Sequence, residues 1–346
     1  MSDLLGIDIG HDTIKLVSIF KDASGLVLEV LGETKTPEMD DETGVNKNKY
    51  FNEVAEALKV LMADLKIKAK GMRVVVDLPE SEVISRLVRL PPLKDSEILD
   101  ALKFEAETFV PYPLEQVSID YEVIEKDDAG RLTIFVIAAK NDLIQSYIKM
   151  LKTLDLELVA LEPPSVALRR IVKNGIKTVE KIIILDLGEK YSNIFNIDRG
   201  NVYFSRSLPV GGESLTRAVS LGLGLDMASA EEYKKAYGIK EDQLEGKIRA
   251  VAMPVFNSIA EELRKAMALF MEDSSGGKPV ELLILNGGGA NLPGLAEELT
   301  KMLGVEVQVA QPFVNIDVSK VKLSINLNTE GCRFSLAVGL ALRGLV

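Results

Sequence analysis

The feature of this sequence that most restricts its fold is a short pattern that occurs twice, about half a chain apart. The segment Leu4-Leu5-Gly6-Ile7-Asp8-Ile9-Gly10 is echoed by Ile182-Ile183-Ile184-Leu185-Asp186-Leu187-Gly188. In each copy an apolar run predicts a buried strand, an aspartate stands near its end, and a glycine begins a turn into a second apolar run. The repeat indicates two lobes built on the same plan.

The two repeated turns carry residues suited to phosphate and metal binding. Backbone N–H groups around Gly10 to Thr13 can cradle phosphate oxygens, and Asp8 can hold Mg²⁺ through water. Asp186 and Gly188 offer the same chemistry in the second copy. Two carboxylates that point into one cleft repel each other unless a cation lies between them. A single turn of this kind is equally well explained as an ordinary turn, but the repetition favours a polyphosphate site with Mg²⁺.

A third loop is rich in glycine. The apolar strand Leu282–Leu285 is followed by Asn286, by the glycines 287 to 289, and by a helix entered near Pro293. Three consecutive glycines allow the backbone to approach a flat ligand closely. The alternative is a strand-to-helix turn that requires positive φ. We expect ligand contact, because one turn does not need three glycines.

The remaining pattern predicts a further unit between the repeats. Phe51, Val54, Leu58, Leu61 and Leu65 recur at spacings of three and four, so one helix should bury that stripe. Residues 81–156 then read as an inserted α+β subdomain. Its predicted elements are a strand Val83–Leu90, a helix Asp95–Phe109, and a hairpin of Val117–Ile124 and Leu132–Ala138.

Composition excludes several classes of protein. The net charge of −11 argues against nucleic-acid binding, because neutralising phosphates requires clustered Lys and Arg. One cysteine, Cys332, and one histidine, His11, cannot form a disulfide or a Cys/His metal cluster within the chain. No run approaches the roughly 20 apolar residues of a membrane span. We therefore expect a cytoplasmic protein.

Together the three loops resemble the phosphate-1, phosphate-2 and adenosine motifs of the superfamily of actin, hexokinase and DnaK-type chaperones. Two segments look like its connecting helices, Leu158–Ser165 and Phe334–Gly344. The small residues Ala337, Gly339 and Ala341 would let these helices cross closely. The resemblance implies an α/β, actin-like fold of duplicated ribonuclease H-like lobes.

Other segments are similar to the PilM family of type IV pilus assembly and its cell-division relative FtsA. They are Phe104–Glu107, Val110–Glu115 and Ser207–Thr216. In these families an α+β subdomain is inserted where residues 81–156 lie here. The resemblance implies lobe I at 1–80, 157–180 and 330–346, and lobe II at 181–329 with a small subdomain near 213–258.

The resemblance also implies which residues bind ATP and Mg²⁺. They are Asp8, Gly10, His11, Asp12, Thr13, Lys15, Asp186, Gly188, Gly211, Gly212, Glu213, Glu262, Lys265, Gly287, Gly288, Gly289 and Asn291. Asp8 and Asp186 would hold Mg²⁺, and His11 departs from the small residue expected at its position. Glu262 and Lys265 share a face of the helix Ile259–Met271, where an exposed charged face is the alternative.

Activity and partners follow from the same resemblance. Glu162 is the nearest candidate for positioning an attacking water, although an acid near a helix start is a common structural feature. We expect ATP binding with weak or no hydrolysis. The implied partner is a PilN-like bitopic membrane protein, whose cytoplasmic N-terminal tail would enter a groove near Phe104–Leu114 and recruit the chain to the inner face of the membrane. Contact with assembly motor ATPases and self-association stay open. The alternatives are the cytoplasmic domain of a type II secretion GspL protein, an FtsA-like division protein and a small-molecule kinase.

Overall fold

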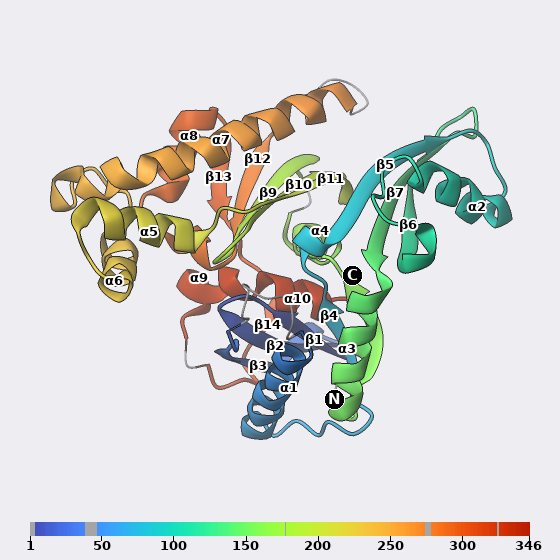
Figure 1. The fold of residues 1–346 in the computed structure, drawn as a ribbon, viewed down its shortest axis with the longest axis horizontal. Helices are drawn as coiled ribbons and strands as arrows, with labels where there is room; N and C mark the ends of the chain where they lie inside the picture. The colour runs from blue at the N-terminus through green and yellow to red at the C-terminus, as the bar shows by residue number, and fades with distance from the viewer. Residues whose placement is uncertain (1–3, 39–46, 177, 274–277, 324) are drawn as a thin grey trace.

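The structure is a computed structural model that describes residues 4–38, 47–176, 178–273, 278–323 and 325–346. Three sheets form within these residues (Figure 1). In chain order the elements are β1 (Leu4–Ile9), β2 (Thr13–Asp22), β3 (Gly25–Lys35), α1 (Lys47–Asp64), β4 (Arg73–Asp77), the 3₁₀ helix η1 (Glu80–Glu82), β5 (Val83–Leu90), α2 (Asp95–Ala106), η2 (Leu114–Gln116), β6 (Val117–Lys126), β7 (Leu132–Lys140), α3 (Asn141–Thr153), β8 (Glu157–Glu162), α4 (Pro164–Gly175), β9 (Lys181–Leu187), β10 (Ser192–Asp198), β11 (Asn201–Leu208), α5 (Gly212–Leu223), α6 (Met227–Tyr237), η3 (Leu244–Gly246), α7 (Lys247–Asp273), β12 (Leu282–Asn286), η4 (Gly288–Asn291), α8 (Leu295–Leu303), β13 (Glu306–Val309), β14 (Ile316–Asp317), α9 (Leu327–Glu330), η5 (Gly331–Phe334) and α10 (Ser335–Ala341).

The first sheet has the strand order β14-β3-β2-β1-β4-β8. β1 forms an antiparallel hairpin with β2 and pairs in parallel with β4. β1 and β4 carry apolar residues on both faces, because each face of this part of the sheet is covered by the protein. The predicted helical stripe lies on α1, where Phe51 and Leu58 pack with Ile7 of β1. On the other side, α10 packs against β2.

The second sheet repeats the central plan of the first. Its order is β11-β10-β9-β12-β13, with an antiparallel β9–β10 hairpin and a parallel β9–β12 pair. β9 therefore corresponds to β1, β10 to β2 and β12 to β4. Phe256 and Leu263 of α7 and Leu299 of α8 belong to the same apolar core as the strands. The duplicated α/β lobes predicted from the sequence are confirmed.

The third sheet belongs to the insertion between β4 and β8. Its order is β5-β7-β6, and the predicted β6–β7 hairpin is present. The predicted helix also forms, although it ends at Ala106 instead of Phe109. Figure 1 shows this subdomain to the side of the two larger sheets. Its buried Phe135 belongs to the core of the second sheet.

The first connecting segment differs from the prediction. Residues 158–161 were expected to be helical, but they lie in β8, which pairs in parallel with β4. The helix α4 begins only at Pro164. Pro163 donates no hydrogen bond to the strand ladder, and a proline in the first helical turn costs nothing, because the N–H groups there have no helical partner.

The second connecting helix and the close crossing are confirmed. α10 crosses α4 where a β-carbon on Gly339 would lie 2.4 Å from the carbonyl oxygen of Ala167. A β-carbon on Gly6 of β1 would likewise lie 2.4 Å from the carbonyl oxygen of Ala337. Glycine is therefore required on both sides of α10. Within the described ranges, no helix has the length and hydropathy needed to cross a bilayer.

Gly339→Ala is expected to lower the free energy of unfolding by about 1–3 kcal/mol, because the added methyl group meets backbone that cannot move aside. Urea denaturation measures this change. Gly175→Ala, at the end of α4, is the matched control, since its β-carbon meets nothing within 4 Å. Equal stability of the two variants would show that the crossing is not tightly packed.

Candidate functional site

The two repeated hairpins present Asp8 and Asp186 in the same way. Asp8 is paired across its hairpin with Lys15, whose Nζ lies 3.5 Å from Asp8 Oδ2. Asp186 is paired with Asn193, whose Nδ2 donates to Asp186 Oδ2 at 3.3 Å. The turns also match, since Gly10 N donates to the Thr13 carbonyl oxygen and Gly188 N to that of Tyr191.

A third polar residue stands beside each aspartate, on the neighbouring parallel strand. Asp77, at the end of β4, accepts a hydrogen bond from Ile9 N at 2.6 Å. Asn286, at the end of β12, donates from Nδ2 to Asp186 Oδ1 at 2.8 Å. We did not predict Asp77, Asn193 or Asn286 as site residues. The available signal was that β4 and β12 each end in a polar residue after an apolar run.

Burial and like charge make this site unfavourable for ionised carboxylates. Burial raises the pKa of Asp8, against the lowering effect of Lys15. Burial also raises the pKa of Asp77 to about 8, and the charge of Asp8 adds to the rise. The pKa of Asp186 is raised by burial, with hydrogen bonds from Asn193 and Asn286 opposing the rise and the Asp8 charge adding to it. A cation near these groups would relieve the repulsion.

This donor set fits a magnesium ion that is coordinated mainly by water and phosphate. Among the described residues, no group of three His, Cys, Asp or Glu side chains is arranged to hold a metal ion. Mg²⁺ usually keeps several waters and binds through one or two carboxylates together with substrate phosphates. Asp8 and Asp186 are therefore suited to hold such an ion together with a polyphosphate.

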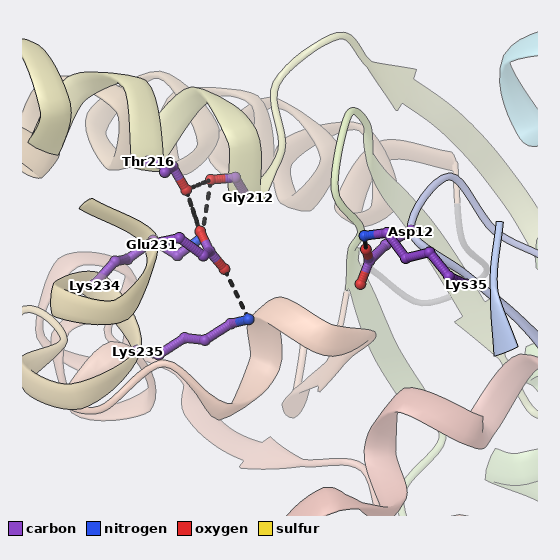
Figure 2. Close-up of polar contacts among 7 residues, drawn as sticks. All are labelled: Asp12, Lys35, Gly212, Thr216, Glu231, Lys234 and Lys235. Carbon is purple, nitrogen blue, oxygen red and sulfur yellow. Dashed lines mark hydrogen bonds and ion pairs between the residues drawn. The ribbon is translucent and has the colours of Figure 1, made fainter. Parts of the chain in front are cut away.

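The tips of the two hairpins face each other. The rings of His11 and Tyr191 have centroids 5.3 Å apart, one from each hairpin. Asp12 forms an ion pair with Lys35 of β3, which Figure 2 shows. Lys35 was not among the predicted residues. The structure thus brings the first predicted turn against the second through His11 and Tyr191, while Thr13 begins β2 opposite Lys35.

The glycines at the start of α5 hold the second turn in place. Gly212 N donates to the Gly188 carbonyl oxygen and Glu213 N to that of Glu189, each at 2.9 Å. A β-carbon on Gly211 would lie 2.3 Å from the Glu189 carbonyl oxygen. These N–H groups therefore position the turn itself, and a direct phosphate contact from them stays a prediction.

A buried polar cluster adjoins the same turn. Lys234 of α6 is 9% exposed, and its Nζ donates to the Gly212 carbonyl oxygen at 3.1 Å and to Thr216 Oγ1 at 2.9 Å. The same Nζ lies 2.6 Å from Oε2 of Glu231. Figure 2 shows the side chains of Thr216, Glu231 and Lys234 gathered beside Gly212. In the sequence, the only indication of this cluster is that Glu231 and Lys234 stand three residues apart along the chain.

The predicted pair of Glu262 and Lys265 forms on α7. Lys265 Nζ donates to Glu262 Oε1 at 2.8 Å, and Arg206 of β11 lies 3.0 Å from Glu262 Oε2. Lys265 is 62% exposed at its side chain. Glu262, whose side chain is 18% exposed, therefore takes part in the contact of α7 with β11, and a contact of the pair with ATP stays a prediction.

The glycine-rich loop is partly explained by packing. Gly287 has a φ of 81°, and a β-carbon there would lie 2.6 Å from the Leu187 carbonyl oxygen. A β-carbon on Gly289 would meet the Leu187 side chain at 2.5 Å. Gly288 faces open space, and Asn291 follows in η4. Gly288 is therefore the glycine of this loop that packing leaves available to a ligand.

Glu162 is held in a buried ion pair. It ends β8 instead of lying on a helix, and Arg170 donates to its two carboxylate oxygens at 2.6 and 2.9 Å. Arg343 also pairs with it. Arg170 in turn donates to the Gly339 carbonyl oxygen of α10. This geometry ties β8 to both connecting helices, and a role in positioning water stays a prediction that the geometry does not favour.

Asp77→Asn is expected to flatten the pH dependence of stability. A carboxyl whose pKa rises from 3.8 to about 8 on folding stabilises the fold only while it is protonated. Its contribution is complete below pH 3.8 and is lost as pH rises toward 8, by up to about 1.4 kcal/mol per pH unit. In urea denaturation between pH 5 and 8, the free energy of unfolding should fall less steeply with pH in Asp77→Asn than in the wild type. Asp100→Asn, on exposed α2, is the control. Identical slopes in wild type and Asp77→Asn would contradict this assignment.

Comparison with known proteins agrees with this arrangement. Two duplicated sheets, paired hairpins and two crossing helices define an actin-like ATPase fold. The crystal structure of MreB 5 of Spiroplasma citri bound to AMPPNP has this fold, with a TM-score of 0.56 at 12% identity over 99% of this chain and 96% of that one. A chain of the PilM–PilN type IV pilus biogenesis complex matches with a TM-score of 0.82 at 25% identity, covering 99% of both chains.

The family follows from a match along the whole chain. The profile of the type IV pilus assembly protein PilM family matches residues 6–345, and the chain belongs to that family. The cell division protein FtsA of Staphylococcus epidermidis is 23% identical over 92% of this chain and 66% of its own length. FtsA of Bacillus subtilis is 24% identical over 44% of this chain and 39% of its own length. The chain thus spans less than two thirds of both curated relatives.

Proposed function

We propose that this protein is a cytoplasmic, ATP-binding adaptor of the type IV pilus assembly platform, recruited to the inner face of the cytoplasmic membrane. The observation that carries the nucleotide part is the matched placement of Asp8 and Asp186 in two facing hairpins. Membership of the PilM family supports the pilus part.

The proposed nucleotide site uses residues from both lobes. Asp8 and Asp186 would hold Mg²⁺, while Lys15 and the turn at Gly10 would face the phosphates. Gly288 would lie against the adenosine. The half-buried Glu231 and the buried Lys234, next to Gly212, offer an acid and a cation for the ribose side. MreB 5 of Spiroplasma citri was solved with AMPPNP and with ADP, and a shared fold supports nucleotide binding here.

Slow or undetectable hydrolysis is part of the same proposal. Both carboxylate oxygens of Glu162 already accept hydrogen bonds from Arg170, which leaves this candidate poorly placed to orient water. A coupled phosphate-release assay with Mg²⁺–ATP measures the rate. Robust turnover dependent on an added small substrate would instead support a kinase.

The proposed partner is a PilN-like membrane protein. The solved PilM–PilN complex, which this chain matches along its whole length, supports this partner. The groove would involve the inserted subdomain around 104–114. There Phe104 is 72% exposed, and Tyr112 is 37% exposed with Lys140 Nζ 4.2 Å from its ring centroid. Contact with motor ATPases and self-association are further parts of this proposal.

The division into lobes is proposed with the boundaries given above. The separate sheets support lobe I, the insertion at 81–156 and lobe II. The small subdomain near 213–258 is supported by its own apolar cluster of Val219, Ala230 and Ile248.

Titration of a peptide with the sequence of the PilN-like N-terminal tail into the full chain tests the adaptor function. We expect saturable binding of one peptide per chain. A protein that binds Mg²⁺–ATP but shows no heat with this peptide would contradict the adaptor role while leaving the nucleotide site standing.

A further inference from the structure

Glu80 is a buried carboxylate at the junction of three parts of the molecule. It begins η1, the short turn that joins β4 of lobe I to β5 of the inserted subdomain, and it is 5% exposed. Its Oε2 accepts a hydrogen bond from Ser165 N in the first turn of α4 at 3.1 Å. Its Oε1 is hydrogen-bonded to Ser205 Oγ of β11. One side chain therefore joins η1, a connecting helix and the lobe II sheet.

The hydroxyl of Ser205 extends this connection into the inserted sheet. Ser205 Oγ lies 2.8 Å from Ser85 Oγ of β5. β11 is the edge strand of the lobe II sheet, and β5 is an edge strand of the inserted sheet. Leu87, two residues further along β5, packs against the lobe II core. The two sheets thus meet at a polar bridge next to apolar packing.

Glu80 is also close enough to the cleft to respond to its charge. Burial raises the pKa of Glu80, its hydrogen bonds with Ser205 and Ser165 lower it, and the charge of Asp186 adds to the rise. Glu80 also follows Asp77 by three residues, and Asp77 accepts a hydrogen bond from Ile9 N of the Asp8 hairpin. A ligand that orders this hairpin would therefore also order the backbone that leads into η1.

We propose that Glu80 couples the nucleotide site to the inserted subdomain, so that Mg²⁺–ATP bound at the Asp8 hairpin orders η1 and, through the bonds of Glu80 to Ser165 and Ser205, also orders β5. Glu80 is a positioning residue in this scheme and does not touch the nucleotide. Because coupling between two binding sites is reciprocal, a partner bound to the inserted subdomain raises the affinity for Mg²⁺–ATP by the same factor. This inference rests on the proposed ATP site.

Hydrogen exchange followed by mass spectrometry tests the coupling on the full chain. In the wild type, saturating Mg²⁺–ATP is expected to slow amide exchange in β5 at least about threefold. Glu80→Ala should still bind Mg²⁺–ATP, measured by titration, but lose the slowing in β5. Glu80→Gln keeps an acceptor for Ser165 N and should therefore retain part of the slowing of amide exchange in β5. Ser205→Ala leaves Glu80 in place and should lose the slowing as well.

Glu122→Ala is the matched control. Glu122 of β6 lies 2.7 Å from Arg169 of α4, so its loss breaks another contact between the inserted sheet and that helix and leaves the partners of Glu80 in place. This variant should keep the wild-type response. Unchanged slowing in folded Glu80→Ala and Ser205→Ala, or equal loss in Glu122→Ala, would overturn the coupling while the ATP site remains. A wild type that binds no Mg²⁺–ATP would instead refute the proposed function on which the coupling rests.

Discussion

Replacing Asp186 by alanine is expected to weaken binding of Mg²⁺–ATP at least about tenfold, which is about 1.4 kcal/mol. Asp186 is held in place by hydrogen bonds from Asn193 and Asn286. A carboxylate placed in this way would hold a hydrated Mg²⁺ ion beside the phosphates. Asp8→Ala should have an effect of the same size, because the two residues occupy equivalent positions.

Comparing ATP binding with and without Mg²⁺ shows whether Asp186→Ala weakens binding through loss of the metal ion or through a disturbed fold. Without Mg²⁺, removing a half-buried negative charge lowers repulsion of the phosphates, so Asp186→Ala should bind metal-free ATP at least as well as the wild type. Isothermal titration with Mg²⁺ and with EDTA measures both affinities. Asp100→Ala, on the exposed face of α2, should match the wild type. Equal weakening in both conditions would show that Asp186 acts on the fold and not on the ion.

Replacing Phe104 by serine is expected to weaken binding of the PilN-like tail by about tenfold or more. Phe104 projects from α2 with 72% of its surface exposed, while Ile98, Leu102 and Ala106 bury the other face of this helix. An exposed aromatic ring offers a partner a large apolar area at a low entropic cost. Such rings often dominate binding energies at interfaces.

A second exposed apolar residue provides the control for Phe104. Val60 of α1 is 58% exposed and belongs to lobe I, outside the insertion. Val60→Ser should leave binding of the tail peptide unchanged, and Phe104→Ser should leave the affinity for Mg²⁺–ATP unchanged when no peptide is present. Tail binding that tolerates Phe104→Ser would place the groove away from the outer face of α2.

The duplicated hairpins could be predicted because their signal is local. Each consists of an apolar run, an aspartate and a glycine turn within a few residues, and Asp8 and Asp186 were found in this way. Asp77 and Asn286 were missed because they reach the site through parallel pairing with distant strands. Strand neighbours of this kind cannot be recognised from the spacing of residues along one segment.

Spacing along one helix also does not reveal the tertiary neighbours of a charged pair. Glu262 with Lys265 and Glu231 with Lys234 have the same spacing on two helices, so helical periodicity does not distinguish them. Tertiary packing does, because α6 lies against the start of α5 whereas Glu262 meets Arg206 of β11. The first connecting helix was also predicted to begin too early, since the run Leu158–Leu161 is compatible with a strand or a helix until Pro163 and the pairing with β4 are considered.

Isothermal titration of ATP into the unmodified chain, with Mg²⁺ and with EDTA, tests the central claim most directly. If Asp8 and Asp186 form one nucleotide site, one ATP should bind per chain, at least about tenfold more tightly with Mg²⁺ than without it. No heat of binding in either condition, or an affinity that does not depend on Mg²⁺, would contradict the assignment of the facing hairpins as a magnesium–nucleotide site.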